Sequence, residues 1–298
     1  MKNKKSNPII PVSGFLAVTV GLFLLASCGR QSGALTFKTI KVEDFVKHPK
    51  GTEDDHGLKY KISFTYPANY SDKAVLKSLQ QKFIRYTLEN LTSGYDPDAK
   101  AKDYGALTPE KAVDELVADL KKSYLDAIRD ESETDDSDFQ LRTGWEFDIN
   151  NEILFANDAL LQLKTEAYVY LGGAHGSYGT SSYLFNLQTG VEYSRDDVFK
   201  SEAAADIRRL IINELLKIWT DSWDRDMMYD GIDYIWTEKT DFAVTSAGIQ
   251  ILYSDYEIGS YSMGAPVVVI PYAAIMPYLR EGTPVWDVAN QYATGAAR

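Results

Sequence analysis

Apolar and polar side chains alternate along residues 58–66, LKYKISFTY, with the apolar ones at every second position. This period of two predicts a half-buried strand, because successive side chains of a strand point to opposite faces. Residues 139–193 are rich in aromatic and β-branched side chains and are broken by turns that contain glycine. That stretch therefore predicts a meander of antiparallel strands.

Three other segments repeat their apolar positions with the helical period of three to four residues, which predicts amphipathic helices. The second of them begins at Thr108 and Pro109, an N-cap followed by a first-turn proline. The side chains expected to face the core are Val75, Leu76, Leu79, Phe83, Tyr86 and Leu91 in residues 71–91, Val113, Leu116, Val117, Leu120, Tyr124 and Ile128 in residues 108–128, and Ile207, Leu210, Ile211, Leu215 and Ile218 in residues 203–219.

The carboxyl-terminal part predicts a further hairpin over residues 241–259, with its turn at residues 246–248. The sequence PVVVIPY, residues 266–272, predicts a short apolar strand, and the helical turn after it is stopped by Pro277. Runs of strands and helices in this order predict an α+β fold, in which antiparallel sheets carry amphipathic helices packed on one face.

The amino-terminal end has the pattern of an export signal. Lys2, Lys4 and Lys5 precede an apolar run over residues 12–25, and the motif LLASC that ends at Cys28 resembles a bacterial lipobox. The run is shorter than the roughly 20 residues of a membrane span. Lipidation of Cys28 would also explain why an exported chain has a single cysteine. We therefore expect an exported lipoprotein that is anchored to the membrane through lipidated Cys28.

Two alternatives to lipidation stay open, an ordinary signal peptide and an uncleaved anchor. In the lipoprotein interpretation, residues 1–27 are the signal peptide and residues 28–34 form a tether. In some Gram-negative lipoproteins, acidic residues directly after the cysteine resemble a surface-export signal. The tether, CGRQSGA, has no acidic residue at that place. Their absence favours a protein that faces the periplasm.

The formal net charge is −12, and removal of the signal segment, which holds three lysines and no acid, makes it more negative. Such a surface repels phosphate backbones, so we expect no nucleic-acid partner. It would attract a cationic partner instead. The plainer alternative is that the acidity only keeps the protein soluble.

One glycine-rich stretch, YLGGAHGSYGT at residues 170–180, contains one of the three histidines of the chain. Gly172, Gly173 and Gly176 suit a tight reversal of the chain. His175 could act as a general base, as a metal ligand or as a brace for the turn. Because no HxxxH, HExxH, CxxC, GxSxG or phosphate-loop spacing occurs, we favour the brace or a ligand contact and expect no metal, cofactor or catalytic set.

A second candidate stretch is SDYEIGSYSMGAP, residues 254–266. Its Tyr256, Glu257 and Tyr261 are candidate ligand-binding residues, since tyrosine is favoured on binding surfaces. Glu257 could also pair with His175 if the two strand ends meet. The alternative function is therefore a cell-wall or peptide hydrolase that uses His175 with Glu257 or Asp255.

Two acidic clusters invite a calcium site, but neither has the spacing of a calcium loop. We expect solvated loops at both. The residues concerned are Glu131, Glu133, Asp135, Asp136 and Asp138 in the first cluster, and Asp221, Asp224, Asp226, Asp230 and Asp233 in the second.

The sequence YVYLGGAHGSYGTSSYLFNLQTG and the later TSAGIQILYSDYEIGSYSMGAPVVVIPYAAI resemble the RsiV-like domain family. The resemblance covers about residues 139–279, so we expect an RsiV-like domain over residues 139–298 and its smaller companion domain over residues 35–138. Members occur in anti-sigma factors, where the domain recognises lysozyme outside the cell, and beside peptidoglycan deacetylases.

Neither the signalling role nor the deacetylase activity is carried over, because we see no sigma-binding segment, transmembrane helix or metal-binding deacetylase domain in the sequence. The resemblance implies a non-enzymatic envelope lipoprotein. Its expected partner is an envelope protein such as a basic, lysozyme-like muramidase, or a cell-wall glycan of the peptidoglycan type.

Overall fold

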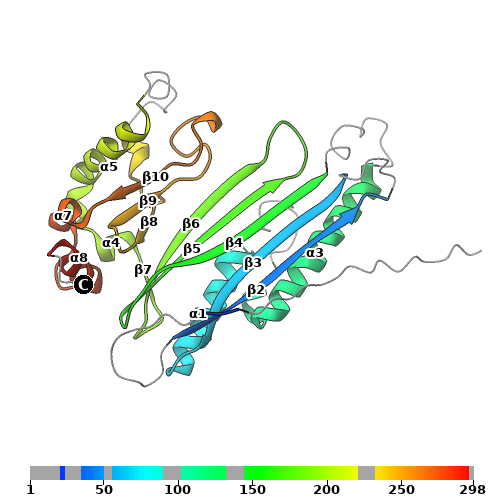
Figure 1. Cartoon of the computed structure of the whole chain (residues 1–298), viewed down its shortest axis with the longest axis horizontal. Coiled ribbons are helices and arrows are strands. Elements are labelled where there is room, and N and C mark those ends of the chain that lie inside the picture. The colour runs from blue at the N-terminus through cyan, green and yellow to red at the C-terminus, as the bar shows by residue number, and fades with distance from the viewer. Residues whose placement is uncertain are drawn as a thin grey trace, which may run out of the picture.

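The computed structural model describes residues 21–23, 35–49, 56–89, 102–131, 144–220 and 232–294. It confirms the α+β fold class, with a long sheet covered by helices on one face and a smaller sheet beside it (Figure 1). The large sheet has seven strands in the order of the sequence. They are β1 (Gly21–Phe23), β2 (Thr36–Lys47), β3 (Gly57–Asn69), β4 (Trp145–Ala156), β5 (Leu160–Tyr170), β6 (Ser177–Asn186) and β7 (Glu192–Tyr193).

Neighbouring strands of the large sheet are antiparallel except β3 and β4, which run parallel from the pair Leu58 and Trp145 to the pair Ser63 and Asn150. A parallel pair requires a crossover connection, and α1 (Lys73–Ile84) and α3 (Pro109–Glu131) supply it. The antiparallel meander expected over residues 139–193 is confirmed in β4 to β7, and the parallel pair joins its first strand to β3. The sheet also continues without a break from strands of residues 35–138 into strands of residues 139–298.

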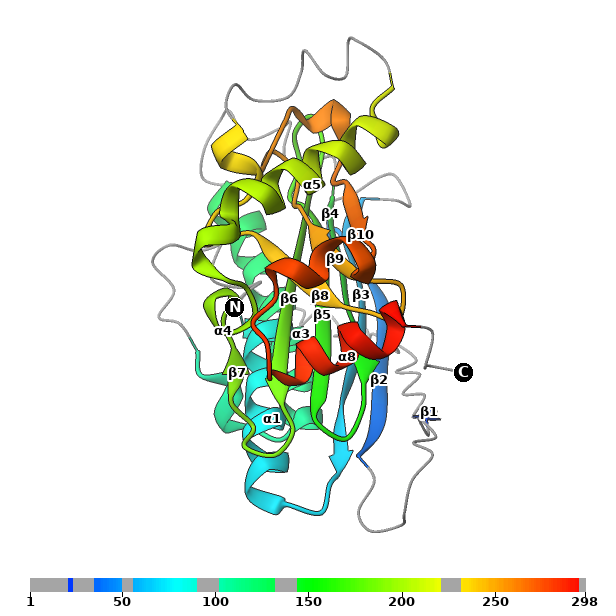
Figure 2. The same cartoon turned by 90° about the vertical axis from the view of Figure 1, so that its left-hand side faces the viewer.

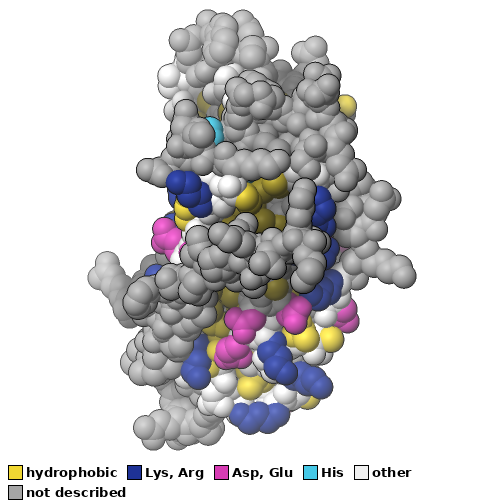
Figure 3. Space-filling view, turned by 90° about the vertical axis from the view of Figure 1, so that its right-hand side faces the viewer, with side chains coloured by type: hydrophobic (Ala, Val, Ile, Leu, Met, Phe, Trp, Pro, Cys, Tyr) yellow, Lys and Arg dark blue, Asp and Glu magenta, His cyan; other side chains and the backbone are white. Residues whose placement is uncertain are grey.

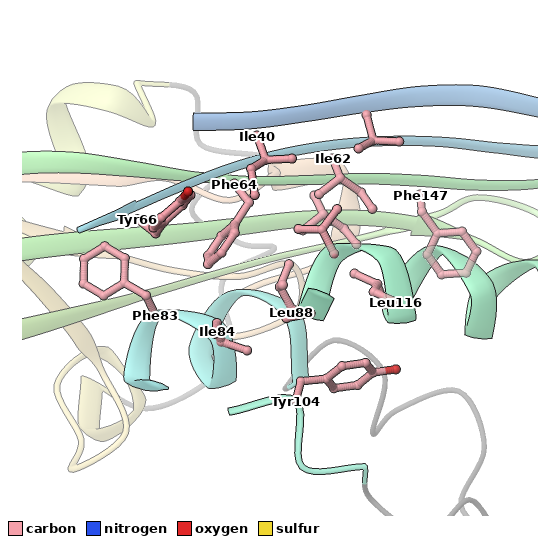
Figure 4. Packing of buried hydrophobic residues seen from close by; sticks show 14 of the residues in the cluster. Ile40, Ile62, Phe64, Tyr66, Phe83, Ile84, Leu88, Tyr104, Leu116 and Phe147 are labelled. Atoms are coloured by element: carbon pink, nitrogen blue, oxygen red, sulfur yellow. The ribbon is translucent and has the colours of Figure 1, made fainter. Parts of the chain in front are cut away.

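The first hydrophobic core lies between the large sheet and α1 and α3. Figure 4 shows Phe64 of β3 and Leu88 pointing into this space from opposite sides. The N-terminus of α1 is capped by the Asp72 carboxylate, which accepts from the N–H groups of Ala74 and Val75 at 2.8 and 3.0 Å. A π-helical turn, Arg85–Glu89, extends α1, and a short 3-10 helix, Tyr104–Ala106, precedes α3.

A second core surrounds the small sheet of β8 (Asp241–Val244), β9 (Ile249–Leu252) and β10 (Val267–Ile270), whose order is β10-β9-β8. Figure 2 shows α5 and α8 in front of this sheet. The helices of this part are α4 (Arg195–Val198), α5 (Ala204–Ile218), α7 (Tyr272–Ile275) and α8 (Pro284–Ala293), with 3-10 helices at Ser201–Ala203, Ile232–Ile235, Tyr261–Met263 and Met276–Tyr278.

The predicted helices and the predicted hairpin are confirmed at α1, α3, α5 and β8–β9. One core prediction is wrong, because Ile218, at the end of α5, is 50% exposed, and the predicted core residue Leu91 lies outside the described residues. The strand β2 and the helix α8 are among the elements that were not predicted. The strand β2 has buried side chains at Phe37, Ile40 and Val42. The helix α8 has a start signal that the sequence shows, since the Thr283 hydroxyl accepts from the N–H of Trp286 and Pro284 follows Thr283.

The predicted lipobox cysteine, Cys28, and the tether lie outside the described residues. Within the apolar run, only residues 21–23 are described, as β1 paired with β2. Among the residues that the structure describes, no helix is both long enough and apolar enough for a membrane crossing. On the face in Figure 3, basic and acidic side chains both occur, interspersed with hydrophobic ones.

Candidate functional site

The glycine-rich loop joins β5 to β6 at the upper end of the large sheet in Figure 1. Gly172 and Gly173 have φ angles of 98° and 100°, a region that side chains with a Cβ rarely enter. Gly176 is needed for a different reason, because a Cβ there would lie 2.4 Å from the ring of Tyr168. The reversal predicted from the glycines is therefore present, and Tyr168 packs directly over its end.

His175 is exposed, and both of its ring nitrogens are engaged. The Nδ1 atom lies 2.8 Å from the carbonyl oxygen of Gly176, and Nε2 lies 3.1 Å from the hydroxyl of Tyr256. Because a carbonyl oxygen only accepts, Nδ1 carries a proton and donates to Gly176. The imidazole is thus held by a neighbour on each side.

Three rings form what we call the aromatic cluster: His175, Tyr256 and Tyr261. The His175 ring stacks on Tyr261 with centroids 3.9 Å apart and an angle of 18° between the rings. Tyr256 lies 6.1 Å from His175 and 5.7 Å from Tyr261, tilted by 36° and 34°. Distances below 7 Å are those of interacting aromatic pairs. The cluster joins the β5–β6 loop to the segment between β9 and β10.

Tyr256 has a φ angle of +64°, and it is the only non-glycine residue in the described part of the chain with a positive φ. It occupies the third position of a turn in which the N–H of Glu257 donates to the carbonyl of Ser254 at 3.2 Å. Glycine is the residue that usually suits such a position. A left-handed conformation costs a residue with a side chain about 1–2 kcal/mol. Such strain in native structures often occurs at functional sites.

The turn that carries Tyr256 is fixed to the outer edge of β6. Three alternate backbone N–H groups of that edge donate to side-chain oxygens of the small-sheet region. The pairs are Tyr178 with the Asp255 carboxylate at 2.9 Å, Thr180 with the Ser254 hydroxyl at 3.1 Å, and Ser182 with the Asp241 carboxylate at 3.1 Å. This row, which we call the edge clamp, satisfies donors that an open sheet edge leaves unpaired.

Two carboxyl groups in this region have unusual electrostatics. Burial raises the pKa of Asp241 to about 6, and the nearby Glu257 carboxylate adds to the shift, while the N–H of Ser182 opposes it. Burial also raises the pKa of Glu257, against the effect of its hydrogen bond with Ser254. Both groups therefore favour the neutral form more strongly than an exposed acid does.

Glu166, on the solvent side of β5, behaves in the opposite way. Its burial would raise its pKa, but hydrogen bonds from Lys164 and Tyr178 outweigh burial and leave the pKa lowered. The Lys164 ammonium lies 2.6 Å from the Glu166 carboxylate.

The structure brings together most of the residues singled out in the sequence. Gly172, Gly173 and Gly176 form the loop, and His175, Tyr256 and Tyr261 meet in the aromatic cluster. The third candidate of the second stretch, Glu257, takes another place. Its carboxylate accepts from the N–H of Ser254 at 2.9 Å, so the partner of the imidazole is a phenol and not a carboxylate.

Asp255, the other acid considered as a partner of His175, accepts from Tyr178. Within the described ranges, no group of three or more His, Cys, Asp or Glu side chains is placed to hold a metal ion. Both acidic clusters considered for calcium have side chains that lie outside the described residues.

Sequence reasoning missed Tyr168 and the edge clamp. The signal for Tyr168 was available, because residues 168–178 place a tyrosine at both ends of the loop. The edge clamp has no local signal, since Ser182 and Asp241 are 59 residues apart and meet only through the packing of two sheets.

Two family models match the chain. Residues 196–273 match a protein family of unknown function, DUF3298, and residues 52–178 match a model described as deacetylase PdaC. None of the curated proteins matches the chain. Residues 179–195 lie between the two matches and include most of β6 and all of β7. The edge clamp is on β6.

Two solved structures share the fold. A DUF3298 family member from Bacteroides fragilis is 22% identical, covers 87% of this chain and 99% of its own length, and has a TM-score of 0.69. A DUF3298 family protein from Pseudomonas aeruginosa is 15% identical, with coverages of 83% and 95% and a TM-score of 0.56. The chain is thus similar to DUF3298 over residues 196–273 and to the PdaC model over residues 52–178, and it shares its fold with two DUF3298 family structures.

Proposed function

We propose that this chain is a non-enzymatic binding protein of the bacterial cell envelope, and that the aromatic cluster is its docking surface. The observation that carries the proposal is the state of His175, whose two ring nitrogens are engaged by Gly176 and Tyr256. A general base needs a carboxylate to orient it and a nucleophile or water to activate. His175 has a phenol and a stacked ring instead, which suits a brace within a recognition surface.

The position of the cluster supports the same function. Tyr256 is 46% exposed although its backbone is strained. Because a ring that is this exposed gains little from packing, its strained position is better explained by contact with a ligand. In this proposal the protein is exported and lipid-anchored through Cys28, and it faces the periplasm. Its ligand is an envelope protein such as a basic muramidase, or a glycan of the peptidoglycan type.

The test uses the mature chain, residues 28–298, immobilised and exposed separately to a purified basic muramidase and to soluble peptidoglycan fragments. We expect retention of at least one ligand, and its loss in Tyr256→Ala and in His175→Ala. Tyr234→Ala is the matched control, because Tyr234 is 58% exposed and lies outside the cluster. If neither ligand is retained, the proposal fails.

The hydrolase alternative predicts a different result with the same proteins. Peptidoglycan fragments or peptides would be converted to products by the wild-type chain, and turnover would collapse in His175→Ala. We expect no products from either protein, so a product whose formation depends on His175 would contradict the binding function.

A further inference from the structure

Neutral hydroxyl groups lie within the aromatic cluster and next to Tyr261 in the chain. Ser260 and Ser262 flank Tyr261, and their hydroxyl oxygens lie 2.9 Å apart at the exposed surface. The hydroxyl of Tyr256 is hydrogen-bonded to Nε2 of His175 at 3.1 Å. Such groups both donate and accept hydrogen bonds, as the hydroxyls of a sugar do.

The carboxylates on the neighbouring sheet surface are already paired with lysines of the same surface. Glu146 lies 2.7 Å from Lys59, and Asp148 lies 3.2 Å from Lys61. In the β4–β5 register, Glu146 lies opposite Tyr170 and Asp148 lies opposite Tyr168, on the two strands that lead to the glycine-rich loop. A surface with matched charges gives little net attraction to a cationic protein, in spite of the net charge of the whole chain.

The acids of the 254–257 turn are also occupied. Asp255 accepts from the N–H of Tyr178, and Glu257 accepts from the N–H of Ser254. Both are therefore bound to backbone donors of the fold, which leaves ring faces and hydroxyls as the chemistry that the site presents to a ligand.

We propose that the aromatic cluster binds a neutral glycan chain, whose sugar rings stack on Tyr256 and Tyr261 while their hydroxyls bond to the hydroxyls around the cluster. This inference rests on the proposed docking function and narrows its ligand to one class. Flat aromatic faces are suited to the C–H face of a sugar ring. Tyr256 is 46% exposed, and its ring lies 5.7 Å from that of Tyr261 at an angle of 34°, so the two rings offer adjacent faces.

The experiment measures binding of a soluble β-1,4-linked N-acetylglucosamine hexasaccharide to the mature chain by titration calorimetry. A purified basic muramidase is titrated in a parallel arm. Four variants are compared: Tyr256→Ala, Tyr261→Ala, Tyr261→Phe and the control Tyr234→Ala. The expected result is glycan binding that falls about tenfold or more in each of the two cluster alanine variants and is retained in Tyr261→Phe and Tyr234→Ala.

The outcomes separate this inference from the docking function. Binding of the muramidase alone, lost in Tyr256→Ala, would overturn the glycan assignment and leave the docking function standing. Binding of neither ligand by a folded wild-type chain would overturn both. Glycan binding that is unchanged in Tyr256→Ala and Tyr261→Ala would place the site elsewhere and overturn the inference, with the far-UV spectrum of each variant confirming that it is folded.

Discussion

Asp255 and Tyr178 are joined by two hydrogen bonds across the boundary between the two sheets. The Asp255 carboxylate accepts from the backbone N–H of Tyr178 at 2.9 Å, and the backbone N–H of Asp255 donates to the carbonyl of Tyr178 at 3.2 Å. Asp255 thereby pairs with the backbone N–H and carbonyl groups of Tyr178, as a neighbouring strand would do at this edge. It also fixes the turn that places Tyr256 beside His175.

Removing the Asp255 carboxylate should destabilise the protein. In Asp255→Ala the N–H of Tyr178 loses its acceptor at a partly buried edge, which costs about 1–2 kcal/mol. Asp255→Asn keeps an oxygen in that place and should remain within about 0.5 kcal/mol of the wild type. Urea unfolding of the three proteins measures the difference. Equal stability of the alanine and asparagine variants would show that the hydrogen bond contributes nothing.

Tyr256 is expected to have a function that outweighs its backbone strain. Tyr256→Gly relieves the positive φ and should be about 1 kcal/mol more stable than Tyr256→Ala, which keeps it. Both variants lack the ring and should bind ligand equally weakly. Thermal or urea unfolding gives the stability order, and the binding titration gives the second part. A glycine variant no more stable than the alanine variant would show that this turn is not strained.

Stability should depend on pH through Asp241. Its pKa of about 6 in the folded chain lies above the ordinary value of 3.8, so the folded state holds the proton more tightly than the unfolded state. The contribution is therefore fully present below about pH 4 and is lost as the pH rises through about 6. By linkage its size is on the order of 1–3 kcal/mol.

Asp241→Asn tests this dependence, because the amide oxygen can still accept from the N–H of Ser182. The free energy of unfolding of the wild type should fall between about pH 4 and pH 7, and the fall should be smaller in the variant. A residual slope is expected from Glu257, whose pKa is also raised. Glu238→Gln, at an exposed turn, is the control and should follow the wild type. A variant slope as steep as the wild-type slope would rule out Asp241 as the source.

Asn151 should be one of the costly polar residues to remove. It is 3% exposed, and its amide accepts from the N–H of Thr65 at 2.6 Å and donates to the carbonyl of Thr65 at 2.8 Å. These bonds join β3 to β4 just after their parallel ladder ends. Asn151→Ala leaves both backbone groups unpaired, at a cost of roughly 2–4 kcal/mol. Glu152→Ala, exposed on the same strand, should change the unfolding free energy by less than about 0.5 kcal/mol; equal losses in the two variants would refute the role of the amide.

The local elements could be predicted because their signals are local. The helical period of α3 and its start at Thr108 and Pro109 depend only on residues a few positions apart, and so does the alternation in β3. The glycines of the β5–β6 loop likewise announced a reversal, because a positive φ is a property of one residue. The missed helix α8 had the same kind of signal at Thr283 and Pro284.

The sequence by itself determined the fold class, the position of most helices and strands, and the presence of two unusual stretches around His175 and Tyr256. Only the tertiary structure decided which side chains of the two stretches contact each other. His175 meets Tyr256 across 81 residues of chain, and Glu257, one of the acids considered as its partner, bonds to Ser254 instead. The reason is physical: periodicity records which face of an element is buried, whereas the partner of a polar side chain depends on how two sheets pack, and no local pattern records that packing.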